Sequence, residues 1–113
     1  MSVSHVTTHV LDTGSGKPAA GVAVTLQVLD GGEWGLIAAG ATDADGRIKE
    51  LGPDRLPSGT YRLVFDTGAY FATTGTETFF PEVTLTFRVA ATQAHYHVPL
   101  LLSPFAYSTY RGS

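Results

Sequence analysis

Residues 22–29 read VAVTLQVL, and the alternation within this stretch decides the fold class. Its aliphatic side chains occupy every second position, namely Val22, Val24, Leu26 and Val28. A period of two is that of a β-strand with one face buried and the other turned toward solvent. The Asp-Gly-Gly sequence at residues 30–32 favours a hairpin turn. The stretch therefore predicts a strand that turns back through residues 33–42.

The same period extends outward along the chain in both directions. Further strands are predicted at residues 6–12, 60–66, 82–89, 94–102 and 105–111. In two of these strands we expect the following side chains to point inward: Tyr61, Leu63, Phe65, Val83, Leu85, Phe87 and Val89. The alternation breaks after residue 66, where Asp66 or Thr67 is suited to cap a short helix. Short strands joined by turns are typical of an antiparallel sandwich or barrel, so we expect an all-β fold.

The composition restricts the classes of protein to which the chain can belong. Of its 113 residues, 43% are hydrophobic and 15% are charged, which excludes a disordered protein and suits a single domain over residues 1–113. The net charge is −3 and the seven basic residues are scattered singly, so the sequence argues against nucleic-acid binding. There is no cysteine, which excludes disulfides and thiolate chemistry.

The same survey bears on localisation. No apolar stretch approaches the length of a membrane span, and the opening MSVSHVTTHV lacks the apolar core of a signal peptide. We therefore expect a soluble, cytoplasmic protein without a membrane partner.

Histidines are the first candidates for chemistry. His95 and His97 are two residues apart on a predicted strand, so they project the same way, roughly 6.5–7 Å apart. Such a pair suggests zinc, but a third ligand such as His9 or a carboxylate is needed and the local spacing supplies none. His9 lies within a predicted strand, whereas His5 lies near the start of the chain and is uninformative. From residue type alone, solvent-facing histidines remain the alternative to a site.

The other candidates are polar residues at a turn and at the end of the chain. Arg47 follows the turn residue Gly46, and Tyr110 and Arg111 are the last two residues of the last predicted strand. Taken singly, each is explained as a solvated charge or a polar edge. Residue types thus predict a β-sandwich with a possible cluster of His, Arg and Tyr.

Four motifs, in order, resemble the transthyretin-related family, in the branch that hydrolyses 5-hydroxyisourate. They are THVLDTGSGKPAAGV at residues 8–22, TDADGR at 42–47, FDTGAYF at 65–71 with FFPEV at 79–83, and HYHVPLLLSPFAYSTYRGS at 95–113. The resemblance covers about residues 6–113, and the four motifs together are specific where one alone is weak.

The resemblance implies a transthyretin-like β-sandwich of two four-stranded sheets with one short helix. It also implies a homotetramer, a dimer of dimers, whose active sites lie in a channel between the dimers. The implied reaction is hydrolysis of the small-molecule substrate 5-hydroxyisourate to 2-oxo-4-hydroxy-4-carboxy-5-ureidoimidazoline in urate degradation, with no metal and no other cofactor.

The family's site residues correspond to positions that this sequence retains. The resemblance assigns catalysis to His9, Arg47 and His97, and substrate binding to Tyr110, Arg111, Gly112 and Ser113. A histidine would activate water and Arg47 would stabilise developing negative charge. Which of His9 and His97 is the base stays open.

Two alternatives belong to other functional classes. A carrier of small aromatic ligands with the same fold would lack the set of His, Arg and Tyr residues. An immunoglobulin-like interaction domain would carry a disulfide beside its buried Trp, whereas Trp34 stands in a chain without cysteine. The sequence therefore favours the hydrolase.

Overall fold

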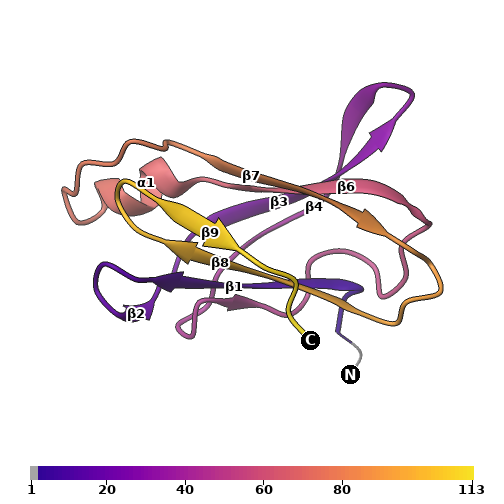
Figure 1. Ribbon diagram of the computed structural model, residues 1–113, viewed down its shortest axis with the longest axis horizontal. Coiled ribbons are helices and arrows are strands. Elements are labelled where there is room, and N and C mark those ends of the chain that lie inside the picture. Colours follow the sequence, from indigo (N-terminus) through magenta and orange to yellow (C-terminus); the bar gives the residue numbers. More distant parts are fainter. Residues whose placement is uncertain (1–2) are drawn as a thin grey trace.

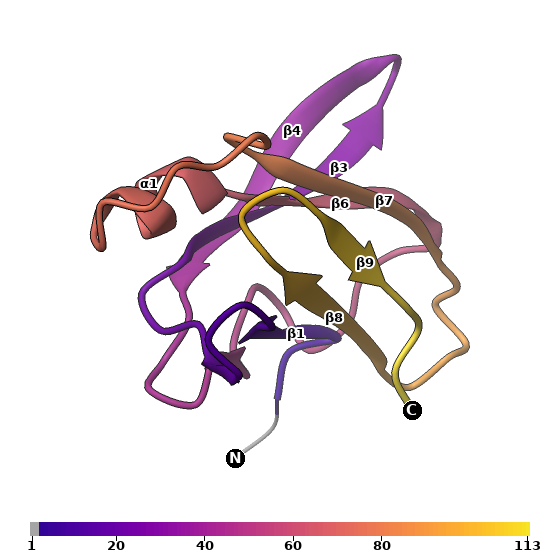
Figure 2. The ribbon, with the colours of Figure 1, turned by 60° about the vertical axis from the view of Figure 1, so that its left-hand side comes forward.

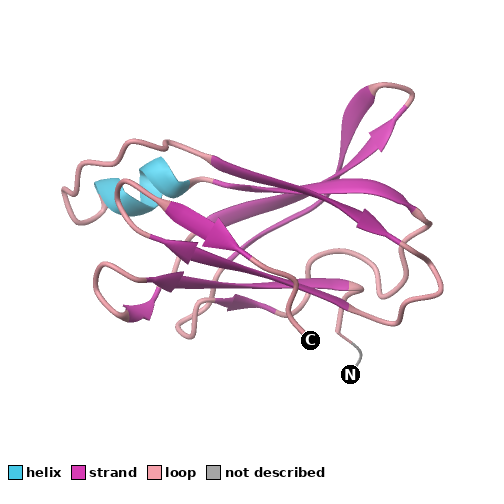
Figure 3. Ribbon diagram, in the orientation of Figure 1, coloured by secondary structure: helices cyan, strands magenta, loops and turns pink. Residues whose placement is uncertain are grey.

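Two β-sheets packed face to face make up the molecule, with a short helix at one end (Figure 1). The computed structural model describes residues 3–113, and Figure 3 shows its strands, its loops and the helix at one end in separate colours. The elements are β1 (Val6–Asp12), β2 (Lys17–Pro18), β3 (Ala23–Asp30), β4 (Glu33–Ala41), β5 (Arg47–Ile48), β6 (Gly59–Phe65), α1 (Thr67–Ala72), β7 (Val83–Val89), β8 (Tyr96–Leu102) and β9 (Tyr107–Thr109).

The two sheets have different edges. The first sheet has the strand order β2-β1-β8-β9. The two-residue strands β2 and β5 both pair with the edge of β1 that faces away from β8, β2 near the end of β1 and β5 near its middle. The second has the order β4-β3-β6-β7, and the hairpin of β3 and β4 projects beyond the body of the molecule (Figure 2). This arrangement is the predicted sandwich with one short helix, and β5 adds a fifth strand to the first sheet.

One strand pairing corrects the sequence-based expectation of an antiparallel sandwich. β1 and β8 run parallel, with Val6 opposite Tyr96 and Asp12 opposite Leu102. Hairpin turns make sequence neighbours antiparallel, but these two strands come from opposite ends of the chain and are joined through the second sheet. Local turn signals therefore carry no information about their relative direction.

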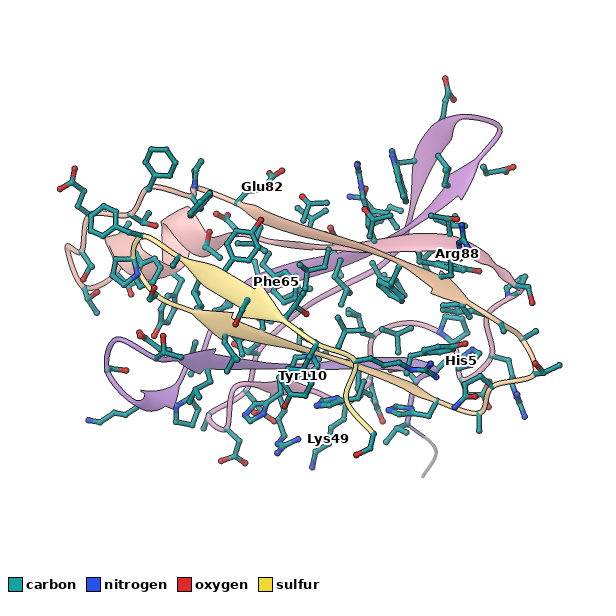
Figure 4. The ribbon with its side chains drawn as sticks, viewed as in Figure 1. His5, Lys49, Phe65, Glu82, Arg88 and Tyr110 are labelled. Carbon is teal, nitrogen blue, oxygen red and sulfur yellow. The ribbon has the colours of Figure 1, made fainter. Side chains whose placement is uncertain are left out.

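The core lies between the sheets and contains the side chains that alternation predicted. Val22, Val24, Leu26, Tyr61, Leu63, Phe65, Val83, Leu85 and Val89 are buried, and Val28 and Phe87 are partly buried against them. Figure 4 shows Phe65 in the space between the two sheets. Burial of each large apolar side chain contributes roughly 1.5–3 kcal/mol, so this shared layer holds the sheets together.

The helix begins where the sequence predicted. The Asp66 carboxylate accepts a hydrogen bond from the backbone N–H of Ala69 at 3.2 Å, which caps the first turn of α1. The helix has six residues, and no helix within residues 3–113 is long and apolar enough to cross a membrane.

His5 differs from the expectation that it would be uninformative. Its ring is 1% exposed, and its Nδ1 accepts a hydrogen bond from the Leu56 N–H at 2.9 Å. The proton therefore sits on Nε2, which donates to the carbonyl of Gln93 at 2.6 Å. His5 thus ties the segment just before β1 to two distant loops and has a structural role.

Candidate active site

The outer face of the first sheet brings three predicted site residues together. Along β1, Val6 and Val10 point into the core, so Thr7 and His9 point outward. His9 lies opposite Arg47 of β5, and Thr7 lies opposite His97 of β8. Paired positions share a face of a sheet, and therefore His9, Arg47 and His97 meet on one surface although they come from three separated segments.

A shallow depression of about 290 Å³ marks this surface. It is lined by Val3, Thr7, Arg47, Lys49, His95, His97 and Ser113. Figure 4 shows Lys49 on the side of the first sheet that faces away from the second, near the C-terminus. The lining is rich in positive charge and imidazole, which suits a small polar or anionic ligand.

A larger hollow lies on the second sheet but lacks comparable chemistry. It measures about 770 Å³, and its polar side chains are Thr25, Asp66 and Glu82 among small and apolar residues. Asp66 already caps α1. This hollow holds no imidazole or guanidinium, so the smaller depression is the better candidate for catalysis.

Arg47 is positioned by the turn that precedes it. Gly46 has φ of 75°, a left-handed conformation that glycine adopts without steric cost. The Asp43 carboxylate accepts hydrogen bonds from the backbone N–H groups of Asp45 and Arg47 at 2.9 and 3.0 Å. The hydrogen bond from Arg47 is the largest cause that holds the pKa of Asp43 below its ordinary value. The turn thus presents the guanidinium from a braced backbone.

The surroundings of His97 keep its ring neutral. Burial lowers the pKa of His97 below its ordinary value of 6.5, and the electrostatic influence of Arg47, His9 and His95 lowers it further. A histidine with a depressed pKa is unprotonated at pH 7 and can accept a proton. No residue among 3–113 forms a hydrogen bond with its Nε2, and this atom is not buried without a partner. That nitrogen is therefore available to a ligand.

Thr7 is a site residue that the sequence reasoning missed. Its Oγ1 lies 2.9 Å from Nδ1 of His97 and 2.9 Å from Nε2 of His95. The structure therefore links His95, which the sequence reasoning left out of the site, to His97. The available signal was spacing, because Thr7 is two residues from His9 and shares its outward face. Lys49, two residues after Arg47, was missed in the same way.

The C-terminal residues divide between two places. Gly112 donates its backbone N–H to the carbonyl of His97 at 2.8 Å, and Ser113 lines the depression. Tyr110 is 58% exposed, and the Arg111 guanidinium lies 4.9 Å from the centre of the Tyr96 ring. Tyr110 and Arg111 line a separate hollow of about 340 Å³ against β7. The structure thus brings two of the four tail residues to the depression.

The donor set around the histidines bears on metal binding. Within residues 3–113, no three His, Cys, Asp or Glu side chains lie close enough together to hold a metal ion. Arg47 and Lys49 border the imidazoles, and their positive charge opposes a divalent cation at this position.

A two-sheet sandwich with His and Arg residues gathered on the outer face of one sheet defines a transthyretin-type domain with a polar surface depression. The chain belongs to the HIUase/Transthyretin family, whose model matches residues 6–112. The family assignment from the four sequence motifs is therefore confirmed.

Individual relatives agree with this assignment. The chain is 50% identical over 106 residues to 5-hydroxyisourate hydrolase of Salmonella dublin, covering 93% of this chain and 78% of that protein. It resembles the solved 5-hydroxyisourate hydrolase of Klebsiella pneumoniae with a TM-score of 0.84 and 41% identity, covering 96% and 98% of the two chains. Transthyretin from Sparus aurata gives a TM-score of 0.91 at 36% identity, covering 96% of each chain.

Proposed function

We propose that this protein hydrolyses 5-hydroxyisourate in urate degradation and that His97 acts as the general base. The relatives named as 5-hydroxyisourate hydrolases support the substrate. The observation that carries the proposal is the neutral His97 imidazole, open at Nε2 and beside the Arg47 guanidinium in a small polar depression. Backbone similarity alone does not distinguish a hydrolase from a ligand carrier, because a transthyretin matches the fold at least as well as a hydrolase does.

The reaction adds water across a ring amide. Nε2 of His97 takes a proton from water as the oxygen attacks the ring carbonyl, a contribution of typically ~10²–10⁴-fold in rate. Arg47 stabilises the negative charge that develops on the carbonyl oxygen. The carbon–nitrogen bond then breaks and the departing nitrogen receives a proton, for which the second imidazole, His9, is suited. The product is 2-oxo-4-hydroxy-4-carboxy-5-ureidoimidazoline, and the steps assigned here proceed through protein groups without a metal.

The remaining lining residues bind and position the substrate. Ser113 supplies a hydroxyl at the rim, and Lys49 adds positive charge that attracts an anionic or oxygen-rich ring. Tyr110 and Arg111, which the family resemblance also assigns to substrate binding, act in this proposal by anchoring the tail. The stacking of Arg111 over the Tyr96 ring supports that role.

The functional unit in this proposal is a homotetramer. The depression is shallow and opens outward from the first sheet, so a second copy facing it would enclose the substrate and exclude water. Light scattering coupled to size-exclusion chromatography measures the assembly directly. A protein that is active as a monomer would overturn this part of the proposal and leave the activity standing.

The activity is tested by generating 5-hydroxyisourate in situ from urate and urate oxidase and following its ultraviolet decay with a chelator present. The wild type is expected to accelerate the decay, and His97→Ala is expected to abolish most of the acceleration. Phe79→Ala is a matched control, because Phe79 is 70% exposed and lies outside the depression. A folded wild type that binds the substrate without accelerating its decay would favour the carrier and refute the hydrolase.

A further inference from the structure

The hydroxyl of Thr7 lies between two imidazole rings. Its Oγ1 is 2.9 Å from both Nδ1 of His97 and Nε2 of His95, and the residue is only 7% exposed. The parallel pairing of β1 and β8 places Thr7 directly opposite His97. This contact is therefore set by two sheet strands, which are the rigid elements of the fold.

Counting protons limits the possible arrangements. A threonine hydroxyl has one hydrogen to donate and two lone pairs to accept. It can donate to one ring while accepting an N–H from the other, or it can accept an N–H from both. In two of these three arrangements, His97 carries its proton on Nδ1 and leaves Nε2 free of hydrogen.

The charges around His97 select among these arrangements. The ring is faced by Arg47 on β5, by Lys49 just after β5, by His9 on β1 and by His95 just before β8, while the tail contributes the uncharged side chain of Ser113. Of these neighbours, Arg47 and Lys49 are cations. A lone pair on Nε2 is attracted by such surroundings, whereas an N–H at the same place would be repelled. The field therefore favours a proton on Nδ1, against Thr7.

Gly112 holds the other edge of the same ring. A Cβ atom built at Gly112 would lie 2.6 Å from Cδ2 of His97 and 3.1 Å from its Cβ, which is closer than real side-chain contacts allow. The φ of Gly112 is not in the positive range, so the backbone does not require glycine there. The requirement for glycine is the close approach to His97, and the Gly112 N–H also binds the His97 carbonyl.

We propose that Thr7 is a positioning residue that accepts the Nδ1–H of His97 and donates its own hydrogen to Nε2 of His95, while Gly112 holds the opposite edge of the His97 ring. The two contacts together fix both the orientation and the tautomer of His97, so that the Nε2 lone pair faces the depression. This inference deepens the proposed function and rests on it for its catalytic consequence. We call the contacts of Thr7 and Gly112 with the His97 ring the His97 clamp. The lowered pKa of His97 agrees with a neutral ring held in this way.

The test compares variants that differ in one hydroxyl. Thr7→Val keeps the shape of the side chain and removes the hydrogen bonds, whereas Thr7→Ser keeps the hydroxyl. Thr8→Val is the matched control, because Thr8 is the next residue of β1, faces inward and donates to the Val98 carbonyl at 2.7 Å. Two-bond ¹⁵N–¹H correlation spectra report which ring nitrogen of His97 carries the proton, independently of activity.

The expected results separate positioning from general structure. Wild type and Thr8→Val should show His97 protonated on Nδ1, and Thr7→Val should show a mixture of tautomers. Thr7→Val should lower kcat about 10- to 100-fold, the size of effect that a misplaced catalytic group produces, with a much smaller change in KM. Thr7→Ser should restore most of kcat and the wild-type tautomer.

Gly112→Ala tests the second contact. Its methyl group displaces the His97 ring or the tail, so kcat should fall while the unfolding midpoint changes little. Gly59→Ala is the control, because a Cβ there would meet Tyr61 at an ordinary 3.6 Å.

Failure of this inference and failure of the proposed function give different results. An active wild type with Nε2 protonated on His97, or a Thr7→Val variant with unchanged tautomer and kcat, overturns the clamp and leaves the hydrolase intact. A wild type without hydrolase activity whose His97 tautomer still depends on Thr7 overturns the function and leaves the clamp intact.

Discussion

Replacing Gly46 with alanine tests the turn that carries Arg47. Gly46 has φ of 75°, and a Cβ atom at this position would lie 2.4 Å from the backbone oxygen of Val10 and 3.2 Å from the backbone nitrogen of Ala19. These neighbours are main-chain atoms of β1 and of the residue that follows β2, and they cannot rotate aside. The turn must therefore shift away from β1.

The cost has two parts. Holding alanine in the left-handed region costs about 1–2 kcal/mol. The shift also weakens the hydrogen bond from the Val10 N–H to the Gly46 carbonyl, which measures 2.7 Å, and such a bond contributes about 0.5–1.5 kcal/mol. We expect Gly46→Ala to lower the free energy of unfolding by about 1.5–3.5 kcal/mol. The value of kcat/KM should fall too, because Arg47 moves with the turn.

Gly16→Ala is the control that separates the cost of the left-handed backbone from the cost of the close contact with β1. Gly16 has the same φ of 75°, but a Cβ there meets no heavy atom within 4 Å. Its cost should be the strain alone, about 1–2 kcal/mol, with activity preserved. The measurement is urea unfolding of both variants at one protein concentration, followed by steady-state kinetics. Equal destabilisation by the two substitutions, or full activity in Gly46→Ala, would refute the reasoning.

Three further predictions concern protonation, the tail and a buried carboxylate. Because the pKa of His97 is lowered, the base stays neutral at pH 7, and activity should be lost only as the pH falls through a value below 6.5. Arg47→Gln removes a positive neighbour, so an NMR titration of the His97 ring should show a higher pKa in this variant than in the wild type. A chain lacking Tyr110–Ser113 loses the hydrogen bond from the tail to the His97 carbonyl. Its kcat should fall at least ~10-fold, while urea unfolding should show a loss of only about 1 kcal/mol in the free energy of unfolding. An unchanged kcat, or a fall in kcat that is explained by unfolding of the variant, would contradict this. Burial and the Asp12 carboxylate raise the pKa of Tyr70 to about 12, and the Tyr70 hydroxyl donates to Oδ2 of Asp12 at 2.8 Å. Tyr70→Phe should therefore lower the free energy of unfolding by about 1.5–3 kcal/mol without lowering kcat. An unchanged urea midpoint would show that this hydrogen bond does not stabilise the fold.

Much of the fold could be predicted because the signals are local. Alternation along residues 22–29 and 82–89 identifies strands and their buried faces, since successive side chains of a strand point to opposite sides. Asp66 predicts the start of α1, because its carboxylate caps the backbone N–H of a residue only three positions away. Short strands such as β2 and β5 were missed, because two residues are too few to show a period.

The candidate site was predictable to a smaller extent. His9, Arg47 and His97 were identified through motifs that resemble a family, and their residue types alone left solvated side chains as an alternative. The structure brings these three together and separates the tail, with Ser113 at the depression and Tyr110 outside it. Sequence patterns could not show that division, because it depends on how the tail crosses β8.

By itself, the sequence determined the longer β-strands, the buried faces of those with clear alternation, and the helix cap and turns between them, because these follow from interactions among residues close together in the chain. Only the tertiary structure decided that β1 and β8 run parallel, that His5 is buried, and that the Thr7 hydroxyl lies between His95 and His97. These contacts join residues about 90 positions apart. Nothing in the period of either strand specifies its partner, and the partner is selected when both sheets bury their apolar faces against each other.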